Sequence, residues 1–292
     1  MKVLLTGASG QLGQALIASC PAGMELMALR RKDLDLADTE ACRRVVAQHR
    51  PAWVLNAGAY TAVDRAESEP ELAHAVNAAA PMAFAEVLAD QGGRLLQIST
   101  DFVFSGKQGS PYRPDQTPEP LGVYGASKAA GEAAALRLPG ALVLRTGWVY
   151  GPVGSNFFRT MLRLMGEREQ LGVVADQVGC PTSTITLAEA CWRATRVEGS
   201  RFLHWSDAGA ASWYDFAVAI AELSQALGLL ASPARIQPIT TAEYPTPARR
   251  PGYSLLDCTA TRALLDLEPV HWRSALTQVL RRIASLEASP SR

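Results

Sequence analysis

The sequence predicts an α/β fold, with a doubly wound parallel sheet and a smaller substrate-binding region toward the carboxyl terminus. Two observations predict it. Short apolar runs alternate with helical stretches through the first half of the chain, and the first run ends in a glycine-rich turn. At 292 residues, the chain is long enough for one large α/β domain and a smaller appendage.

The composition excludes several classes of protein. Acidic and basic residues balance at 28 each, so nothing indicates a nucleic-acid partner. We find no apolar run near the roughly 18 residues of a membrane span, and the apolar start is too short for a signal peptide. The five cysteines form no C-x-x-C pair, and the four histidines lie in no ligand spacing. We expect a cytoplasmic protein with reduced thiols, without a metal site, that binds neither nucleic acid nor membrane.

The first apolar run, Lys2–Thr6, is expected to be a strand that leads into a helix over residues 14–19. The turn between them reads G-x-x-G-x-x-G, with Gly7, Gly10 and Gly13. Glycines let the backbone approach a pyrophosphate, and the helix start offers unpaired N–H groups to it. Such turns also simply connect strands to helices. The position directly after the first strand favours the dinucleotide interpretation.

A second strand is expected over residues 25–29, and it ends in three cations, Arg30, Arg31 and Lys32. In a dinucleotide-binding unit this strand end meets the adenosine ribose, where an acid suits the 2′-hydroxyl of NAD and arginine suits a 2′-phosphate. The three cations therefore favour NADPH, with a solvated loop as the alternative.

The next elements continue the alternation. We expect helices over residues 39–49 and 69–91, the second punctuated by Pro81, and strands over residues 53–57 and 94–98. Small residues follow the third strand and leave room for a ligand in the crevice outside the sheet. Asn77 is either an exposed polar residue or a buried hydrogen-bonding one.

A glycine- and proline-rich loop over residues 105–123 leads into Tyr124 and Lys128. A loop of about 20 residues in a compact domain is typically functional or disordered, and this one leads directly into Tyr124, so we interpret it as functional. On a helix, the i, i+4 spacing puts the phenol and the ammonium on one face. A neighbouring cation favours the phenolate, so the pair can form a proton donor. An isolated Y-x-x-x-K is more often an exposed surface pair, and the rest of the chain has to decide.

The remaining elements divide the chain into two regions. After a fifth strand at residues 141–146, we expect helices over residues 156–166, 186–195, 213–227, 259–265 and 272–286, strands over 171–175, 202–205 and 236–239, a loop over 176–184, and disorder over 288–292. We predict a dinucleotide-binding domain over residues 1–150, to which 171–205 adds further elements. Residues 151–170 and 206–292 are expected to form mainly the substrate-binding region.

Three features occur in order: the glycine turn, a hydroxyl pair Ser99-Thr100 after the fourth strand, and Tyr124 with Lys128. Together they resemble the extended short-chain dehydrogenase/reductase superfamily, which has a Rossmann-like fold. More narrowly, five segments resemble the dTDP-4-dehydrorhamnose reductase family: STDFVFSG, VYGASK, RTGWVYG, DQVGCPT and YPTPARRPGYSLLD. The likeness extends over nearly the whole chain.

The resemblance implies that NAD(P)H reduces the C4 ketone of dTDP-4-dehydro-L-rhamnose to dTDP-L-rhamnose. This is the final step of a pathway that supplies cell-surface polysaccharide such as the O-antigen of lipopolysaccharide. It also implies roles for individual residues. Tyr124 would protonate the C4 oxygen, Lys128 would hold the nicotinamide ribose and lower the tyrosine pKa, and Thr100 would bind the carbonyl. Asp101 and Trp148 would contact the substrate.

The resemblance further implies a set of cofactor-binding residues: Gly7, Gly10, Gln11, Leu12, Gly13, Arg30, Arg31, Asp35, Leu36, Ala57, Gly58, Ala59, Ser99, Tyr124 and Lys128. Arg250 is the candidate for the nucleotide diphosphate, with a structural salt bridge as the alternative. Some relatives have an acid in place of Arg30, which supports NADPH here and leaves NADH open. Two other departures, Phe102 for tyrosine and Gly147 for serine, are expected to change little.

Some relatives carry magnesium at a dimer contact made by carboxylates. Ala15 stands where such an acid would sit, so magnesium and the choice between monomer and homodimer stay open.

Two alternatives remain. A nucleotide-sugar epimerase or dehydratase of the same superfamily would keep NAD bound and return the hydride to the sugar; the three cations and the carboxyl-terminal segments argue against it. A regulatory subunit of methionine adenosyltransferase would share the fold as a binding partner. The intact set of Thr100, Tyr124 and Lys128 favours an enzyme instead.

Overall fold

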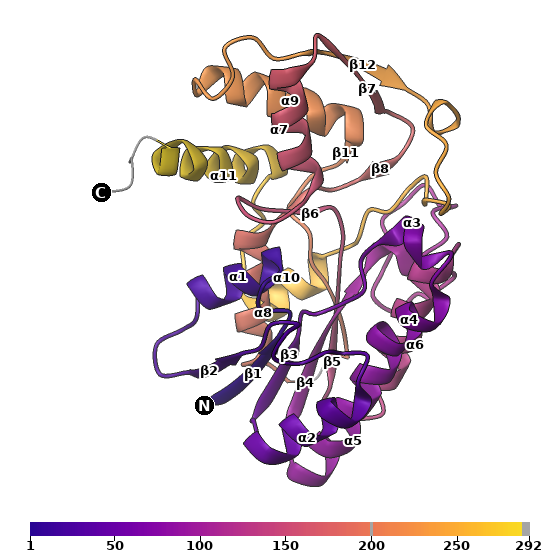
Figure 1. Cartoon of the computed structure of the whole chain (residues 1–292), viewed down its shortest axis with the longest axis vertical. Helices are drawn as coiled ribbons and strands as arrows, with labels where there is room; N and C mark the ends of the chain where they lie inside the picture. The colour runs from indigo at the N-terminus through magenta and orange to yellow at the C-terminus, as the bar shows by residue number, and fades with distance from the viewer. Residues whose placement is uncertain (199–200, 288–292) are drawn as a thin grey trace.

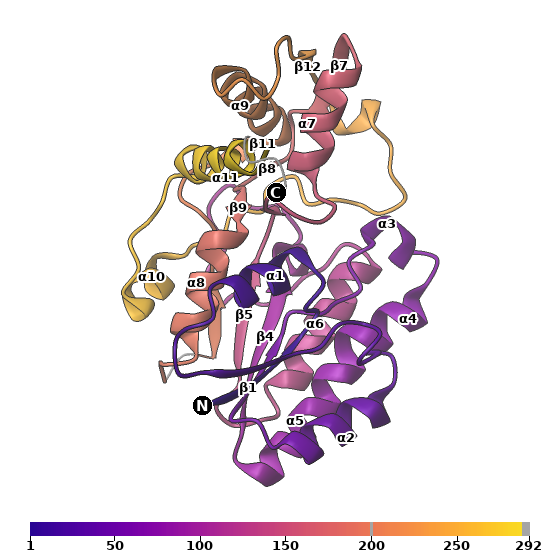
Figure 2. The ribbon, with the colours of Figure 1, turned by 60° about the vertical axis from the view of Figure 1, so that its left-hand side comes forward.

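The computed structural model describes residues 1–198 and 201–287. It has two parts: a parallel sheet covered by helices on both faces, and a smaller group of helices and short strands above one end of that sheet (Figures 1 and 2). The disorder expected over residues 288–292 lies outside the described residues.

Within the described ranges, a six-stranded parallel sheet has the order β10-β5-β4-β3-β1-β2. Its strands are β1 (Lys2–Thr6), β2 (Glu25–Ala28), β3 (Trp53–Asn56), β4 (Arg94–Thr100), β5 (Leu142–Thr146) and β10 (Phe202–His204). The sheet confirms the predicted doubly wound α/β fold. Strand order reverses between β1 and β3, and such a reversal opens a crevice at the carboxyl ends of the strands.

Helices cover both faces of this sheet (Figure 1). One side holds α1 (Gln11–Ala18), α8 (Thr184–Ala194) and α10 (Thr259–Leu265), and the other holds α2 (Thr39–His49), α4 (Pro70–His74), α5 (Ala80–Gln91) and α6 (Val123–Ala135). Leu16 and Leu187 are fully buried on the first side, and Phe84 and Leu88 on the second. Both faces of the sheet are therefore buried from solvent, which explains why its strands are continuous apolar runs in the sequence.

The helix expected over residues 69–91 is interrupted by a π-helical segment, Ala75–Ala79, rather than at Pro81. Pro81 lies in the first turn of α5, where a missing N–H is tolerated. By length and composition alone, Pro70–Gln91 could cross a membrane. Its buried residues, among them Phe84, pack against neighbouring helices in the core, and this packing accounts for the apolar composition.

The smaller part has a core of its own, built around Phe158, Phe216 and Leu276. It comprises α7 (Phe157–Glu167), α9 (Trp213–Ala226), α11 (Trp272–Glu287) and a two-stranded sheet of β7 (Gln170–Val174) and β12 (Arg235–Ile239). Thus β7 belongs to this part, whereas α8 and β10 pack with the large sheet.

Within the described ranges, the short helix α3 (Val63–Ala66) and four short strands were not expected from the sequence. The strands form two pairs: β6 (Val149–Tyr150) with β9 (Thr182–Ser183), and β8 (Val178–Gly179) with β11 (Ala211–Ser212). β8 and β9 lie within the segment 176–184 that was expected to be a loop.

A buried ion pair joins α6 to the sheet. Arg145 on β5 is fully buried and donates to both oxygens of Glu132 at 2.8 and 2.7 Å. The same carboxylate accepts the hydroxyl of Ser99, at the end of β4, at 2.6 Å. Every charge in this cluster is therefore paired inside the protein, as burial demands.

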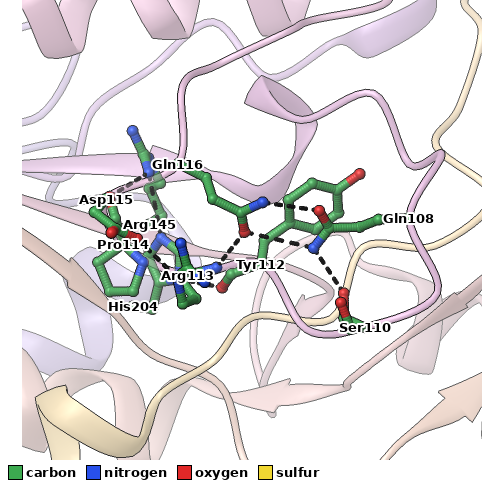
Figure 3. Close-up of polar contacts among 9 residues, drawn as sticks. All are labelled: Gln108, Ser110, Tyr112, Arg113, Pro114, Asp115, Gln116, Arg145 and His204. Carbon is green, nitrogen blue, oxygen red and sulfur yellow. Dashed lines mark hydrogen bonds and ion pairs between the residues drawn. The ribbon is translucent and has the colours of Figure 1, made fainter.

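The loop over residues 105–122 is fastened to the same arginine (Figure 3). Arg145 Nη1 donates to the carbonyl of Pro114 at 3.1 Å and lies 3.3 Å from Nε2 of His204. The other ring nitrogen, Nδ1, lies 3.0 Å from the carbonyl of Tyr112. Burial and the charge of Arg145 lower the pKa of His204 to about 3. A neutral ring that donates from Nδ1 and accepts at Nε2 fits both contacts.

We expect Glu132→Gln to destabilise the protein by about 3–5 kcal/mol, because it leaves Arg145 charged and unpaired in the core. Glu167 provides the control, since it pairs with Arg163 on an exposed helix surface at 2.6 Å. Glu167→Gln should change the free energy of unfolding by less than about 1 kcal/mol. Urea unfolding of both variants measures the difference. Equal effects would contradict the role given to the buried pair.

Candidate active site

A cavity of about 810 Å³ lies at the carboxyl ends of β1, β3, β4 and β5, with further walls from α6, α7 and α9. This is where an open parallel sheet binds ligands. The cavity lining includes nearly all residues that the sequence analysis named for the site: Gly7, Gly10, Gln11, Leu12, Gly13, Arg31, Asp35, Leu36, Ala57, Gly58, Ala59, Ser99, Thr100, Asp101, Tyr124, Lys128, Trp148 and Arg250. Their roles stay predictions.

Arg30 is the exception. It is not part of the lining; its side chain is exposed, and its backbone N–H donates to Oδ2 of Asp33 at 3.0 Å. This bond closes a tight turn at the end of β2, and Arg31, the next residue, is part of the cavity lining. Of the two arginines predicted to bind the cofactor, Arg31 lines the cavity and Arg30 does not.

The glycine turn forms a bare backbone cradle. A β-carbon at Gly13 would lie 2.2 Å from the carbonyl oxygen of Gly7, and one at Gly7 would lie 2.6 Å from Gly58. Gly7 also has a φ of +67°, which favours glycine. Helix α1 begins at Gln11 and has no side-chain cap at Gly10. Its first N–H groups therefore face the cavity without a side chain in the way, which fits a pyrophosphate.

Helix α6 carries the proposed reacting groups. It begins at Val123, so Tyr124 and Lys128 lie one turn apart. Lys128 is almost fully buried and donates from Nζ to the carbonyl of Ile98 on β4 at 2.6 Å. Thr100, at the end of the same strand, donates to Oδ1 of Asp101 at 3.0 Å. The cavity thus brings the three predicted catalytic residues together.

Burial controls how these groups ionise. Desolvation and the charge of Asp101 raise the pKa of Tyr124 to about 12, while the neighbouring Thr100 side chain acts to lower it. The pKa of Lys128 is lowered to about 8 by desolvation. In the protein without a bound cofactor, burial thus sets the tyrosine pKa above its ordinary value, and the lowering effect expected of Lys128 stays a prediction.

Asp101 is buried, and the missing β-carbon of Gly147 leaves space for its side chain. Its side chain is 2% exposed, and its Oδ2 atom has no hydrogen-bond partner among the described residues. Burial raises its pKa to about 6. A β-carbon at Gly147 would lie 2.5–2.8 Å from the three carboxylate atoms. A side chain at position 147 would therefore have to displace the Asp101 carboxylate, while the expectation that glycine in place of serine changes little stays a prediction.

Asn77 proves to be the buried alternative of the two considered. It is 1% exposed and joins the loop after β3 to α6. Its amide donates to the carbonyl of Tyr60 at 3.1 Å and to Ser127 Oγ at 3.0 Å, while its Oδ1 accepts the Tyr60 N–H at 2.9 Å. The π-helical turn that contains Asn77 is a local departure typical of functional sites.

Arg250 lies on the cavity wall and is paired there. It donates to both carboxylate oxygens of Asp64 at 3.1 and 2.9 Å, and also to Thr246 and to the carbonyl of Ala248. This pairing lowers the pKa of Asp64. The salt-bridge alternative is thus present, and it fastens the proline-rich segment to α3.

Several lining residues were missed by sequence reasoning. Thr146, Asn156, Phe157 and Trp213 all face the cavity. Asn156 and Ser212 are the N-caps of α7 and α9 respectively, so the N-terminal end of each helix lies beside the cavity. An aromatic residue at a capped helix start was the available signal for Phe157 and Trp213.

The family described as RmlD substrate binding domain matches residues 1–285. A dTDP-4-dehydrorhamnose reductase of Streptomyces griseus is 44% identical over 284 residues, with 94% of this chain and 91% of the relative covered. The chain belongs to the dTDP-4-dehydrorhamnose reductase family.

Two further relatives of this reductase family bear on the site. The crystal structure of a dTDP-4-dehydrorhamnose reductase from Bacillus anthracis, in complex with NADP, aligns with a TM-score of 0.90 at 33% identity and covers 96% of this chain and 99% of its own. A probable dTDP-4,6-dihydroxy-2-methyloxan-3-one 4-ketoreductase of Streptomyces antibioticus is 40% identical over 297 residues, with 100% of this chain and 99% of the relative covered. The resemblance seen in the sequence is confirmed.

The buried lysine predicts a pH-dependent stability. Below pH 8 the fold must bury the charged ammonium, and this penalty disappears as the pH rises from about 8 toward the ordinary lysine value of 10.5. Lys128→Met should therefore be more stable than the wild type by about 2–3 kcal/mol at pH 7, with the gap closing by about pH 10.5. Urea unfolding across this range measures it. A gap that does not change with pH would contradict the lowered pKa.

Proposed function

We propose that this chain reduces the C4 ketone of dTDP-4-dehydro-L-rhamnose to dTDP-L-rhamnose with NADPH, the final step of dTDP-L-rhamnose biosynthesis for cell-surface polysaccharide. One observation carries the proposal: Thr100, Tyr124 and Lys128 lie in a single cavity with the glycine cradle of α1. Family membership supports the reaction, because relatives over the full chain length are named for it.

In the proposed reaction, bound NADPH supplies the hydride, and negative charge develops on the ketone oxygen. The hydroxyls of Thr100 and Tyr124 are placed to stabilise that charge. Tyr124 then donates its proton, and its pKa of about 12 keeps the phenol protonated at neutral pH until then. Lys128, one turn away on α6, is mostly charged below its pKa of about 8. It favours the phenolate that remains after proton transfer.

The cofactor proposed is NADPH, with NADH as a second donor. The glycine cradle fits the pyrophosphate of either. Arg31 in the cavity lining supports binding of a 2′-phosphate, and a reductase of the same family has been crystallised with NADP.

Arg31→Ala should raise the KM for NADPH about tenfold or more, because charge-assisted bonds to the phosphate are lost. It should leave the KM for NADH nearly unchanged. Arg30→Ala is the matched control and should spare both values.

The substrate class proposed is a dTDP-linked 4-ketosugar, held partly by Asp101, Trp148 and Arg250. One relative is named as a 4-ketoreductase of a different dTDP-linked compound. The configuration of the sugar therefore has to be tested, and the L-rhamno configuration is tested first. The proposed location is the cytoplasm, where all five cysteines, free thiols in the structure, would stay reduced. The residues that line the cavity come from a single chain, so the proposal fits both a monomer and a homodimer.

The direct test is nicotinamide absorbance with dTDP-4-dehydro-L-rhamnose generated in the assay. We expect oxidation of NADPH that requires the sugar, and a loss of about 10²- to 10⁴-fold in kcat for Tyr124→Phe, which lacks the acid. Wild-type turnover in Tyr124→Phe would contradict the role of the phenol. Cofactor binding without any oxidation would favour the epimerase or binding-subunit alternative.

Gly147→Ala tests the placement of Asp101. The added methyl group would push the Asp101 carboxylate aside, and the substrate that Asp101 is proposed to hold would move with it. We therefore expect kcat/KM for the ketosugar to fall about 10- to 100-fold. Gly109→Ala is the control, because a β-carbon there meets nothing within 4 Å. Steady-state kinetics of both variants measure the effect. Unchanged kinetics in Gly147→Ala would show that Asp101 needs no such room.

A further inference from the structure

Trp148 has a backbone conformation that tryptophan rarely adopts. Its φ is +50°, in the left-handed region, where a bulky side chain is strained. The residue lies between the end of β5 and the start of β6, and its carbonyl accepts the N–H of Thr182 at 3.1 Å. Such strain persists only where surrounding contacts determine the conformation. The contacts of the Trp148 indole ring therefore have to stabilise this conformation.

One face of the Trp148 ring is covered by Trp213. The two indoles stack with centroids 3.5 Å apart and planes 1° from parallel. Trp213 is itself fixed. It begins α9 next to a capping box made by Ser212 and Asp215, and its Nε1 donates to Gln177 at 3.2 Å.

The polypeptide also makes room for the indole at Gly179. A β-carbon there would lie 2.5 Å from both Nε1 and Cε2 of Trp148, so any other residue would displace the ring. Gly179 belongs to β8, which pairs with β11 immediately before Trp213. The two elements that hold the ring are therefore joined to each other, and both tryptophans line the cavity.

We propose that Trp213 is a positioning residue for the ketosugar reduction, which rests on the proposed function. By stacking on Trp148 it holds that indole in its strained conformation, at the cavity wall where the sugar must lie. Without Trp213, the backbone of Trp148 would relax toward an ordinary φ and carry the ring away. Trp213 would then act on the reaction through Trp148 rather than by its own contact with the substrate.

A double-mutant cycle tests this coupling in the full chain. We expect Trp213→Leu to lower kcat/KM for the ketosugar about 10²-fold. In a Trp148→Leu background the same change should add no more than about twofold, because the ring that Trp213 positions is already absent. Trp213→Phe keeps a ring that can stack and should recover most of the activity. Losses that multiply independently in the double variant would overturn the proposal.

Trp272→Phe provides the matched control. Trp272 is buried in the core of the smaller part and is not among the cavity-lining residues of the described chain. Its replacement should leave kcat/KM within about twofold of the wild type, in either background. A large loss there would show that any lost tryptophan impairs the enzyme, and would count against a specific role for Trp213.

A spectroscopic test needs no turnover. Each of two indoles stacked face to face should shift the ring-proton resonances of the other upfield in NMR, a shift that Trp148→Leu and Trp213→Leu each remove and Trp272→Phe retains. A wild-type protein without these shifts would overturn the stacking. If the shifts are present but no ketosugar is reduced, the proposed function fails on its own. The cycle is then repeated as the affinity for dTDP by calorimetry, where independent losses would again overturn the positioning role.

Discussion

The buried pair between Glu132 and Arg145 is the contact on which the arrangement of the site depends. It joins α6, which carries Tyr124 and Lys128, to β5. Through Ser99 it also reaches the end of β4. Two charges inside the protein are tolerable only when each is fully satisfied, so the helix and the strand ends have little freedom to slide. The proposed acid and the carbonyl-binding threonine are held in register by this requirement.

A second constraint on the site is the close packing of backbone and side chains around the cavity. Glycines stand where a β-carbon would meet backbone or a functional side chain: Gly13 against Gly7, Gly147 against Asp101, and Gly179 against Trp148. The same crowding dehydrates the ionisable groups. It raises the pKa values of Tyr124 and Asp101 and lowers that of Lys128. A protonated phenol beside a buried lysine suits a site that must give up one proton as a hydride arrives.

The sequence predicted most of the large sheet because its strands are continuous apolar runs separated by clear turns. Helices over Thr39–His49 and Thr259–Leu265 were predicted to the residue. Short strands such as Val149–Tyr150 were missed, since two residues carry no period. The residues of the glycine turn and of the Y-x-x-x-K pair were identifiable because their spacing is local. Trp213 and Glu132 were not, because their partners, Trp148 and Arg145, are brought to them only by the tertiary fold.

The most direct test of the proposed chemistry follows the hydride itself. NADPH carrying deuterium at nicotinamide C4, on the transferred face, is incubated with the protein and dTDP-4-dehydro-L-rhamnose, and the sugar product is examined by mass spectrometry and NMR. The account predicts one deuterium at C4 of dTDP-L-rhamnose for each NADPH oxidised. A product formed without deuterium, or without net loss of NADPH, would contradict it and point to an enzyme that returns the hydride to its own sugar.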